Sequence, residues 1–568
     1  MNHLPYLQRA NEAMRSGSEA FAETKRIHLI TNFTDDFLKK MIVGLFAENG
    51  IYADIYATPY KQYHFALKQP SDPLYQKHAD ATWIFFDANP YSNNEFIEDP
   101  DHFQQVFADI ERLCSTIDGH VVLSTFLLPP HSVYGNLWKE DPLVALVEQW
   151  NRRLEDLAKQ FPCVHLLDMN RIAHILGAGA TRDMRHLYAF DLPFTQTFLF
   201  EAALEFQTWM NAISGKAKKC IVVDLDNTLW GGILGEAGVD GIALGGPYPG
   251  NIFEQVQRIL LQFYERGIIL AINSRNNIED VREALNNHPN MILREPHFAA
   301  MAVNWNNKAD NLEAIAKELN IGLDSLVFLD DDAMNRDLVR SRLPEVCVPE
   351  LGGPETYVHT LLSLRDFPFV ALTDEDRERG KMYAQERQRK DIQATTSDLT
   401  EYIRELHIEM DIRLNDASLI PRLAQLSQKT NQYNATTRRY TEQDLAERMA
   451  GGSLLYSADV KDRFGGYGVT LFAMVDLDGK AAKIDTFLMS CRVMGRNVEY
   501  DFLNHILVSL KERGVQTVTA EYISTAKNKP IEPFFSSAGF IQTDQTDDGH
   551  RLYAMRMEDY PATGLVNS

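Results

Sequence analysis

The stretch VVDLDNTLWGG, residues 222–232, places two carboxylates at the end of an apolar run. The run begins two residues earlier, at Cys220, and its uninterrupted apolar character is typical of a buried strand. In open sheets of parallel strands, ligands bind at the carboxyl ends of the strands. We therefore expect Asp224 at the end of a strand and Asp226 just beyond it. Two carboxylates so close repel each other unless a cation or a proton divides their roles.

Phosphoryl transfer is one chemistry that needs such a pair. A magnesium ion prefers oxygen ligands and leaves room for a substrate phosphate. Asp224 would then attack phosphorus, and Asp226 would protonate the leaving oxygen and later activate water. The pair alone does not establish this chemistry, because a capped turn after a buried strand has the same pattern.

Three later segments supply the other groups that a phosphate site needs. ILAINSRNN (269–277) predicts a second buried strand, ending at the Ser274 hydroxyl. NWNNKADNL (304–312) places Lys308 at the start of a helix. SLVFLDDDAMNRD (325–337) predicts a third strand followed by Asp330, Asp331 and Asp332. Each has an ordinary alternative: a helix cap, a surface lysine or a solvated turn. Their occurrence together, in this order and mostly at strand ends, favours one shared site.

The four segments resemble the four motifs of the haloacid dehalogenase superfamily of phosphoryl-transfer enzymes. The resemblance implies a Rossmann-like domain without a cap. It implies Asp224 as nucleophile and Asp226 as general acid and base. Asp331, with Asp224 and the backbone carbonyl of Asp226, would bind Mg²⁺, and Asp330 would lie behind them, although the sequence leaves the direct ligand open. The residues expected to hold the phosphoryl group are Thr228, Ser274, Arg275 and Lys308.

LDNTLWGGILGEAG, NSRNN, NWNNKADNL and FLDDDAMNRD are further similar to the FkbH-type branch, subfamily IIIC. Relatives commonly have Asn-Pro where Asp332-Ala333 stands here, so the metal shell could differ. The branch implies a D-glyceryl transferase/phosphatase that takes 1,3-bisphosphoglycerate. It would load the glyceryl group onto the phosphopantetheine thiol of an acyl carrier protein and remove phosphate, in polyketide-type biosynthesis. The alternatives are a small-molecule phosphatase with an accessory acyltransferase domain, in sugar or capsule biosynthesis, and a scaffold that only docks carrier proteins.

The spacing of the motifs bears on the size of the substrate. Fifty residues separate Asp224 from Ser274, and 34 separate Ser274 from Lys308. Neither interval is long enough for a large extra cap. An uncapped site does not close over a very small substrate by itself, so a protein-borne substrate or cover from neighbouring domains would fit it.

A second candidate site lies in MSCRVMGRNVEYDFL (489–503), a predicted strand, turn and helix start. Arg492, Gly495 and Asn497 resemble the Arg-x-x-Gly-x-Gly/Ala loop of GNAT acyltransferases, which implies backbone amides aimed at a pyrophosphate, phosphopantetheine or CoA. A later segment, 528–540, resembles their Asn-to-Gly-Phe stretch and adds Asn528 as a pantetheine-binding candidate. Phe534 and Phe535 stand where a catalytic tyrosine is common, which puts ordinary acetyl transfer in doubt. The alternative is a turn without a ligand.

Cys491 lies at the mouth of this loop. Arg492 and a helix N-terminus would lower the pKa of its thiol, and glyceryl transfer could pass through a thioester on it. The alternative is a buried small apolar residue. Cys347, in EVCVPE, fits a core strand better. KTNQYNATTRRYT (429–441) could contact the carrier protein or a phosphate through Arg438 and Arg439, or simply cap a helix.

The N-terminal region shows an α/β pattern that predicts a parallel sheet, including strands at 26–33 and 81–87. LITNFTDDF resembles the first block of SGNH-type esterases, and Asp183 with His186 resembles their last block. The expected Gly-Asp-Ser is absent, and Thr31 or Asn32 takes the place of the serine. We therefore expect a degenerate SGNH-like domain that serves docking or cover, with a working hydrolase as the alternative.

Four regions follow: 1–215, SGNH-like; 216–370, haloacid dehalogenase-like; 371–395, a charged linking helix; and 396–568, a GNAT-like α+β domain. The overall fold class is multidomain α/β. The formal net charge of −23 argues against nucleic-acid binding.

Composition also bears on the compartment. The five cysteines are far apart and odd in number, which excludes zinc modules and disulfide frameworks. The N-terminal residues are polar and no long apolar run occurs, so we expect a cytoplasmic protein that does not span a membrane.

Overall fold

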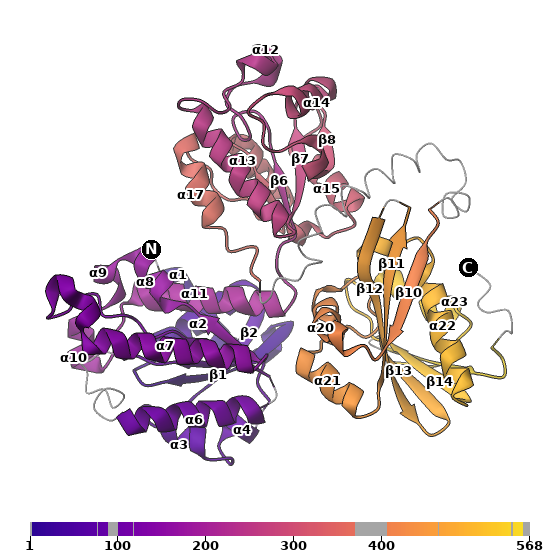
Figure 1. Cartoon of the computed structure of the whole chain (residues 1–568), viewed down its shortest axis with the longest axis horizontal. Helices are drawn as coiled ribbons and strands as arrows, with labels where there is room; N and C mark the ends of the chain where they lie inside the picture. The colour runs from indigo at the N-terminus through magenta and orange to yellow at the C-terminus, as the bar shows by residue number, and fades with distance from the viewer. Residues whose placement is uncertain are drawn as a thin grey trace. The chain divides into compact units, whose positions relative to one another are not determined.

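The structure is a computed structural model, which describes residues 3–76, 78–88, 100–117, 119–369, 406–463, 465–546 and 549–560. The chain divides into two compact units, Met1–Met210 and Asn211–Ser568. Three separate sheets organise it, one in the first unit and two in the second (Figure 1). The predicted linking helix at 371–395 lies outside the described residues.

The first sheet has five parallel strands, in the order β2-β1-β3-β4-β5. They are β1 (Glu23–Thr31), β2 (Ile51–Ala57), β3 (Ala81–Phe85), β4 (His120–Ser124) and β5 (Val164–Leu167). Helices cover both faces, as parallel strands require because both of their faces are apolar (Figure 1). These helices are α1 (Leu4–Ser16), α2 (Asp36–Glu48), α3 (Tyr63–Lys68), α4 (Pro73–Gln76), α6 (Pro100–Thr116), α7 (Pro142–Gln160), α8 (Met169–Leu176), α9 (Ala178–Thr181), α10 (Met184–Phe190) and α11 (Gln196–Ile213).

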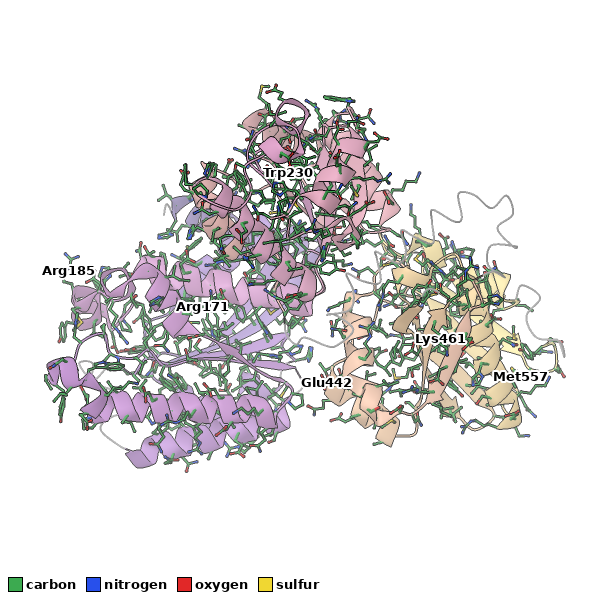
Figure 2. All side chains as sticks on the ribbon, turned by 45° about the horizontal axis from the view of Figure 1, so that its top comes forward. Arg171, Arg185, Trp230, Glu442, Lys461 and Met557 are labelled. Atoms are coloured by element: carbon green, nitrogen blue, oxygen red, sulfur yellow. The ribbon has the colours of Figure 1, made fainter. Side chains whose placement is uncertain are left out.

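The second sheet is also parallel and has the order β8-β7-β6-β9. Its strands are β6 (Cys220–Val223), β7 (Ile269–Ser274), β8 (Phe298–Val303) and β9 (Leu326–Leu329). Alternate residues of β6 point to opposite faces: Ile221 and Val223 join one core, and Cys220 and Val222 join the other. The helices on these faces are α12 (Leu234–Ala237), α13 (Gly250–Glu265), α14 (Ile278–Asn287), α15 (Lys308–Glu318), α16 (Ala333–Arg342) and α17 (Tyr357–Leu362). The side chains of this interior include Trp230, which is fully buried (Figure 2).

The third sheet has seven strands in the order β10-β11-β12-β13-β14-β16-β15. All neighbours are antiparallel except β13 and β14, which are parallel. The strands are β10 (Glu409–Leu414), β11 (Leu454–Asp462), β12 (Gly465–Asp478), β13 (Ala481–Met489), β14 (Thr517–Tyr522), β15 (Ile541–Gln545) and β16 (Arg551–Arg556). Two apolar cores lie on its faces, one with α22 (Val498–Glu512) and α23 (Phe534–Ser537), the other with α20 (Ile420–Lys429) and α21 (Glu442–Ala450).

The predicted multidomain α/β class is confirmed. The three apolar runs expected to form buried strands before Asp224, at Ser274 and before Asp330 do so, as β6, β7 and β9. β12 and β13 form an antiparallel hairpin. The strand β8 is an addition, since its alanine-rich sequence, FAAMAV, gives little sign of a strand. The domain boundaries at 215 and 370 stay predictions. None of the helices in the described part of the chain combines the length and apolar character that a bilayer crossing needs.

Candidate functional site

The predicted site residues of the second sheet gather at its carboxyl edge. Val223, the last residue of β6, pairs with Ile272 of β7 and with Leu329 of β9. The amide of Asp224 donates to Leu329 O at 2.8 Å, which aligns the ends of the two strands. Asp224 and Asp330 therefore emerge side by side, because the strands are parallel and in register. Ser274, the last residue of β7, lies one residue beyond the same level.

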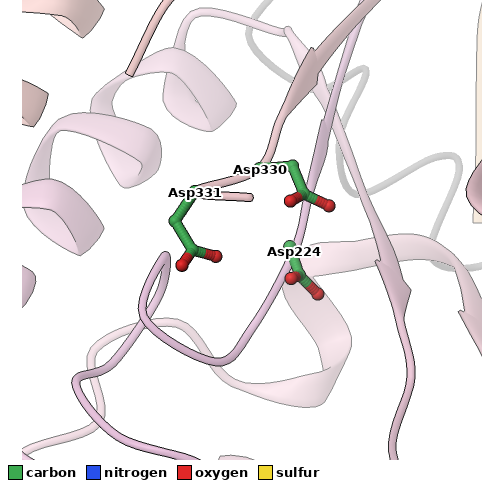
Figure 3. A group of neighbouring side chains, drawn as sticks. All are labelled: Asp224, Asp330 and Asp331. Atoms are coloured by element: carbon green, nitrogen blue, oxygen red, sulfur yellow. The ribbon is translucent and has the colours of Figure 1, made fainter. Parts of the chain in front are cut away.

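Three carboxylates meet there: Asp224, Asp330 and Asp331 each offer an oxygen within 4.8 Å of the others (Figure 3). Asp330 is fully buried, and Asp224 is 8% exposed. Burial, together with the carboxylates of Asp224 and Asp330, raises the pKa of Asp331 to about 6. Burial also raises the pKa of Asp330, although Lys308 acts in the opposite direction. The three acids form a repulsive cluster in a poorly solvated place, and a divalent cation would relieve that repulsion.

Lys308 is a buried lysine inside this cluster, not a surface one. Its Nζ lies 2.8 Å from Asp224 Oδ1 and 3.0 Å from Asp330 Oδ2. It also donates a hydrogen bond to the backbone oxygen of Asn273, at 2.8 Å. The contact with Asp224 is an ion pair without hydrogen-bond alignment. Lys308 therefore supplies a positive charge between the two carboxylates.

The three aspartates of 330–332 have different surroundings. Asp330 accepts bonds from Asn335 Nδ2 at 3.2 Å and from the amide of Asp332 at 2.9 Å, in addition to its contact with Lys308. Asp332 caps α16 by accepting from the amide of Met334. Asp331 has fewer partners, since Thr228 Oγ1 is 3.4 Å from its Oδ1. The arrangement leaves Asp331 the most available ligand of the triplet.

The backbone of the acidic loop is held by Arg336, which is buried. Its guanidinium donates to Asp330 O at 2.9 Å and to Asp331 O at 2.7 Å, and it pairs with Glu350. Thr228, predicted to bind the phosphoryl group, accepts a bond from the amide of Asp331 at 3.2 Å. In this structure, Thr228 links the first acidic segment to the last.

Asp226 has a fixed orientation. Its Oδ1 accepts from Trp230 Nε1 at 2.9 Å and from the amide of Leu234 at 3.1 Å. Its Oδ2 accepts from Asn276 Nδ2 at 3.0 Å. Its side chain therefore bonds to neighbouring loops, and it does not belong to the triad of carboxylates. This separation suits a group that transfers protons, because its role differs from that of a metal ligand or nucleophile.

Ser274 is buried at the end of β7, and its Oγ lies 3.3 Å from Asn276 Nδ2. Asn276 therefore bridges Ser274 and Asp226, two groups with different predicted roles. Arg275, which lies between Ser274 and Asn276 in the sequence, is exposed. Asn276 is not among the residues predicted from the sequence. The signal available was the run of polar residues after the second strand, but the sequence does not say which of its side chains turns inward.

Two further residues support the site from behind. Asn273 is fully buried. Its side-chain Nδ2 donates to Lys308 O at 2.9 Å, and its Oδ1 accepts from Asn311 Nδ2. Tyr357, from α17, donates to Asn227 O at 3.0 Å, and burial raises the pKa of its phenol to about 12. Asn227 has a φ of 53°, so this contact fixes a left-handed residue between the two predicted catalytic aspartates and Thr228.

The second candidate site, in the third sheet's domain, is a turn before α22. Ser490 caps a short helical turn, Cys491–Val493, and accepts from Arg492 Nε at 3.1 Å. Cys491 and Arg492 are half-buried. Gly495 and Asn497 have φ angles of 78° and 61°, and α22 begins directly afterwards. A turn and a helix therefore follow β13, and Cys491, Arg492, Gly495 and Asn497 lie in that turn. Their binding roles stay predictions.

A neighbouring opening in the sheet is filled by the chain itself. Residues 481–484 of β13 pair with residues 517–520 of β14, and beyond them the two strands diverge. The segment 433–435 lies between them: Ala435 N donates to Phe487 O, Met489 N donates to Tyr433 O, and Ile523 N donates to Ala435 O, at 2.8 to 3.0 Å. The backbone edge of β13 before the Cys491 turn, which β14 leaves unpaired, is therefore paired with the segment 433–435.

Asn528, predicted to bind pantetheine, fastens this segment instead. It is fully buried. Its Nδ2 donates to Asn434 O and Ile523 O, and its Oδ1 accepts from Thr525 N and from the Tyr522 hydroxyl. All four hydrogen-bonding positions of the amide are used within the chain. A bond from Asn528 to a ligand would require one of these to break.

Other predicted contacts are also internal. Arg438 pairs with Asp485 and Glu521, and burial lowers the pKa of Arg439 to about 10. Thr441 caps α21 in a capping box with Asp444, the alternative proposed for segment 429–441. Phe534 and Phe535 are core residues. Cys347 is half-buried and its backbone pairs with β9; burial raises the pKa of its thiol to about 12.

In the first unit, the candidate residues stabilise loops. Thr31 is buried and donates its hydroxyl to Phe33 O at 3.0 Å. Asn32 exchanges two bonds of 2.8 Å with the backbone of Asp87. Asp183 caps α10, and its Oδ2 lies 3.7 Å from His186 Nδ1. A threonine whose hydroxyl is hydrogen-bonded within its own loop is a poor nucleophile. The degenerate SGNH-like domain stays a prediction.

Known proteins similar to this chain are found among solved structures. No family model matches the sequence, and no curated protein matches it. Among solved structures, the chain is similar to the N-terminal part of the protein BF1531 from Bacteroides fragilis, which contains a phosphatase domain complexed with Mg. The identity is 26%, the TM-score is 0.59, and the match covers 64% of this chain and 99% of that one.

A second match is the ribosomal-protein-S18-alanine N-acetyltransferase from Escherichia coli, at 17% identity and a TM-score of 0.22. It covers 26% of this chain and 94% of that one.

Proposed function

We propose that this chain is a magnesium-dependent phosphoryl hydrolase whose reaction is coupled to acyl transfer. One observation carries the first part: Asp224, Asp330 and Asp331 converge with the buried Lys308 at the carboxyl edge of a parallel sheet. The similarity to a phosphatase domain complexed with Mg supports it. Three close carboxylates provide ligands for a metal ion, and the buried ammonium group of Lys308 provides a positive charge for a phosphate.

The donor set fits Mg²⁺. Carboxylate oxygens are its preferred ligands, and Asp224 and Asp331 would hold it, with Asp330 kept beside them by Lys308 and Asn335. When bound, Mg²⁺ would supply positive charge that neutralises the phosphoryl oxygens and orients them.

The chain's own residues would divide the reaction into two steps. A carboxylate oxygen of Asp224 attacks phosphorus, the bond to the leaving oxygen breaks, and Asp226 gives that oxygen a proton. Asp226 then takes a proton from water, which attacks the phosphoaspartate and releases inorganic phosphate with Asp224 restored. Lys308 and Ser274 would stabilise the charge on the phosphoryl oxygens, while Asn276 keeps Asp226 aimed at the leaving group.

The proposed substrate is 1,3-bisphosphoglycerate, and the proposed acceptor is the phosphopantetheine thiol of an acyl carrier protein. In this scheme the Cys491 thiolate attacks the acyl carbon, the acyl–oxygen bond to phosphate breaks, and phosphate leaves. The carrier thiol then attacks the thioester and restores Cys491. Cys491 lies half-buried in a turn before α22, a position compatible with that role. The resemblance of the four motifs to FkbH-type proteins motivates this finer assignment.

A plain phosphatase with an accessory domain is the second candidate, and one observation favours it. Residues 433–435 occupy the opening between β13 and β14, and Asn528 is fully committed to holding them. A pantetheine arm carries amides that pair with free backbone edges, and the edge beside Cys491 is already paired. This candidate predicts turnover of free phosphomonoesters without any carrier protein.

The deciding experiment incubates the protein with 1,3-bisphosphoglycerate, Mg²⁺ and a holo-carrier protein, and then measures the mass of the carrier. A glyceryl adduct supports transfer, whereas phosphate release with no adduct refutes it and leaves the plain phosphatase. Asp224→Asn should abolish phosphate release from the phosphomonoester. Loading that survives in Cys491→Ala would refute the thioester route.

A further inference from the structure

The loops around the acidic triad carry exposed apolar side chains. In residues 216–369, all of them described, the large apolar residues with exposed side chains are Ile233, Tyr248, Trp305, Met334 and Leu362. Ile233 and Tyr248 lie between β6 and α13, Trp305 lies in the loop after β8, and Met334 lies in the first turn of α16, which follows β9. Only Leu362 lies elsewhere, at the end of α17. Single exposed apolar residues are ordinary, but their concentration at one edge of a sheet indicates a binding surface.

Hydrogen bonds place three of these residues beside the site. Ile233 precedes Leu234, whose amide donates to Asp226 at 3.1 Å. Trp305 follows Asn304, whose amide donates to Ser274 O at 3.1 Å.

Met334 donates its own amide to Asp332, which in turn donates to Asp330, both at 2.9 Å. Each of the three apolar residues, or its neighbour in sequence, is thus linked by one or two hydrogen bonds to a residue predicted to act in catalysis, phosphate binding or metal binding.

The strand order fixes how these residues follow one another along the edge. Because the order is β8-β7-β6-β9, the loops bring Trp305, Arg275, Ile233 and Met334 to the edge in that sequence. Arg275 is exposed, and the exposed fractions of Trp305, Met334 and Ile233 are 77%, 79% and 45%. We call Ile233, Trp305 and Met334 the apolar rim. The interior offers charges and hydrogen bonds, whereas the rim offers mainly apolar surface.

We propose that the apolar rim binds the organic part of the phosphorylated substrate, and that this part carries an apolar chain next to the phosphate. The inference rests on the proposed phosphatase function and narrows its substrate class. A phosphate held at the triad leaves the rest of its molecule at the carboxyl edge, where these side chains lie. A small polyol phosphate would leave them in water. Because the three-carbon acid of 1,3-bisphosphoglycerate is polar, the inference favours the second candidate, a phosphatase for small molecules.

A matched pair of substrates tests this, hexyl phosphate against ethyl phosphate, with Mg²⁺ present. Complete burial of one methylene is worth about fourfold in binding, so partial burial of the four extra methylenes predicts a preference of about tenfold. The measurements are kcat/KM from phosphate release, and Kd by calorimetry with Asp224→Asn protein, which keeps both ligands intact. The variants are Trp305→Ala and Met334→Ala, and the control is Leu362→Ala, an apolar residue that is 66% exposed on the same domain.

The expected result is a preference for hexyl phosphate that falls toward unity in Trp305→Ala or Met334→Ala and persists in Leu362→Ala. Equal Kd values for the two ligands, or a preference that both rim variants retain, would overturn the inference. A rim that only binds a protein partner predicts the first outcome, equal Kd values. If hexyl phosphate binds preferentially but neither phosphate is hydrolysed by the wild-type protein, the rim stands and the proposed hydrolysis fails.

Discussion

Replacing Lys308 with methionine tests whether charge holds the site together. Methionine is similar in length and apolar, so the packing cost should stay below about 1.5 kcal/mol. The loss of charge is more serious. Asp224 and Asp330, whose side chains are 11% and 0% exposed, lose a cation at 2.8 and 3.0 Å. Removing one partner of a buried ion pair costs about 3–5 kcal/mol, and we expect that loss in metal-free protein at pH 8.

The loss should depend on pH in a definite direction. Without Lys308, the folded-state pKa of Asp330, which burial already raises, should rise further above the unfolded value of about 3.9. The folded variant then binds more protons than the unfolded chain, so its stability falls as pH rises through that window. At pH 5, closer to the range in which Asp330 takes up a proton, the deficit should be smaller than at pH 8.

The assay is thermal unfolding of the full chain, followed at the transition that Mg²⁺ shifts. A deficit of 3–5 kcal/mol corresponds to a decrease in Tm of about 10–15 °C for a domain of this size. The control is Lys308→Met combined with Asp330→Asn, which removes one of the two stranded charges and should recover part of the loss. An equal deficit at pH 5 and pH 8, with no recovery in the double variant, would refute the electrostatic account.

Three further predictions concern single groups. Asp331→Asn should stabilise the metal-free protein at pH 8 by up to about 3 kcal/mol, because a carboxyl whose pKa is raised to about 6 destabilises the folded state above that pH. The gain should vanish near pH 4, and calorimetry should show weaker Mg²⁺ binding; a gain that does not change with pH contradicts the origin assigned to it. Asn276→Leu should lower kcat by about 10- to 100-fold with little change in KM, because Asp226 loses one of its donors; an effect on KM alone would mean that Asn276 binds substrate. Asn528→Ala should destabilise the third domain by about 2–4 kcal/mol and speed hydrogen exchange at Ala435 and Ile523; unchanged exchange at these amides would show that the segment 433–435 is held by other contacts.

Much of the phosphate site could be predicted from the sequence because its parts are local. Each of Asp224, Ser274 and Asp330 ends or follows an apolar run, and parallel strands bring their carboxyl ends to one edge. Lys308 was predicted to lie at a helix start and does, although its depth between two carboxylates depends on packing that no local pattern encodes. Their catalytic roles stay predictions.

The features that the sequence did not indicate are non-local. Asn276 faces inward only because the turn after β7 directs its amide at Asp226. The insertion of 433–435 between β13 and β14 depends on three backbone bonds between segments more than fifty residues apart. Such contacts leave no periodic trace in either segment, so composition and spacing cannot reveal them.

The balance of charge at the triad suggests why the site combines a buried lysine with three acids. Three ionised carboxylates and one ammonium leave a net charge of −2, which a divalent cation would balance. Lys308 forms ion pairs with Asp224 and Asp330, whereas the pKa of Asp331 is raised by burial and by these two carboxylates. With its pKa raised to about 6, a proton competes with the metal for Asp331 at acid pH. The affinity for Mg²⁺ should therefore fall as pH decreases below about 6, and this dependence should weaken in Asp331→Asn, where that proton no longer binds.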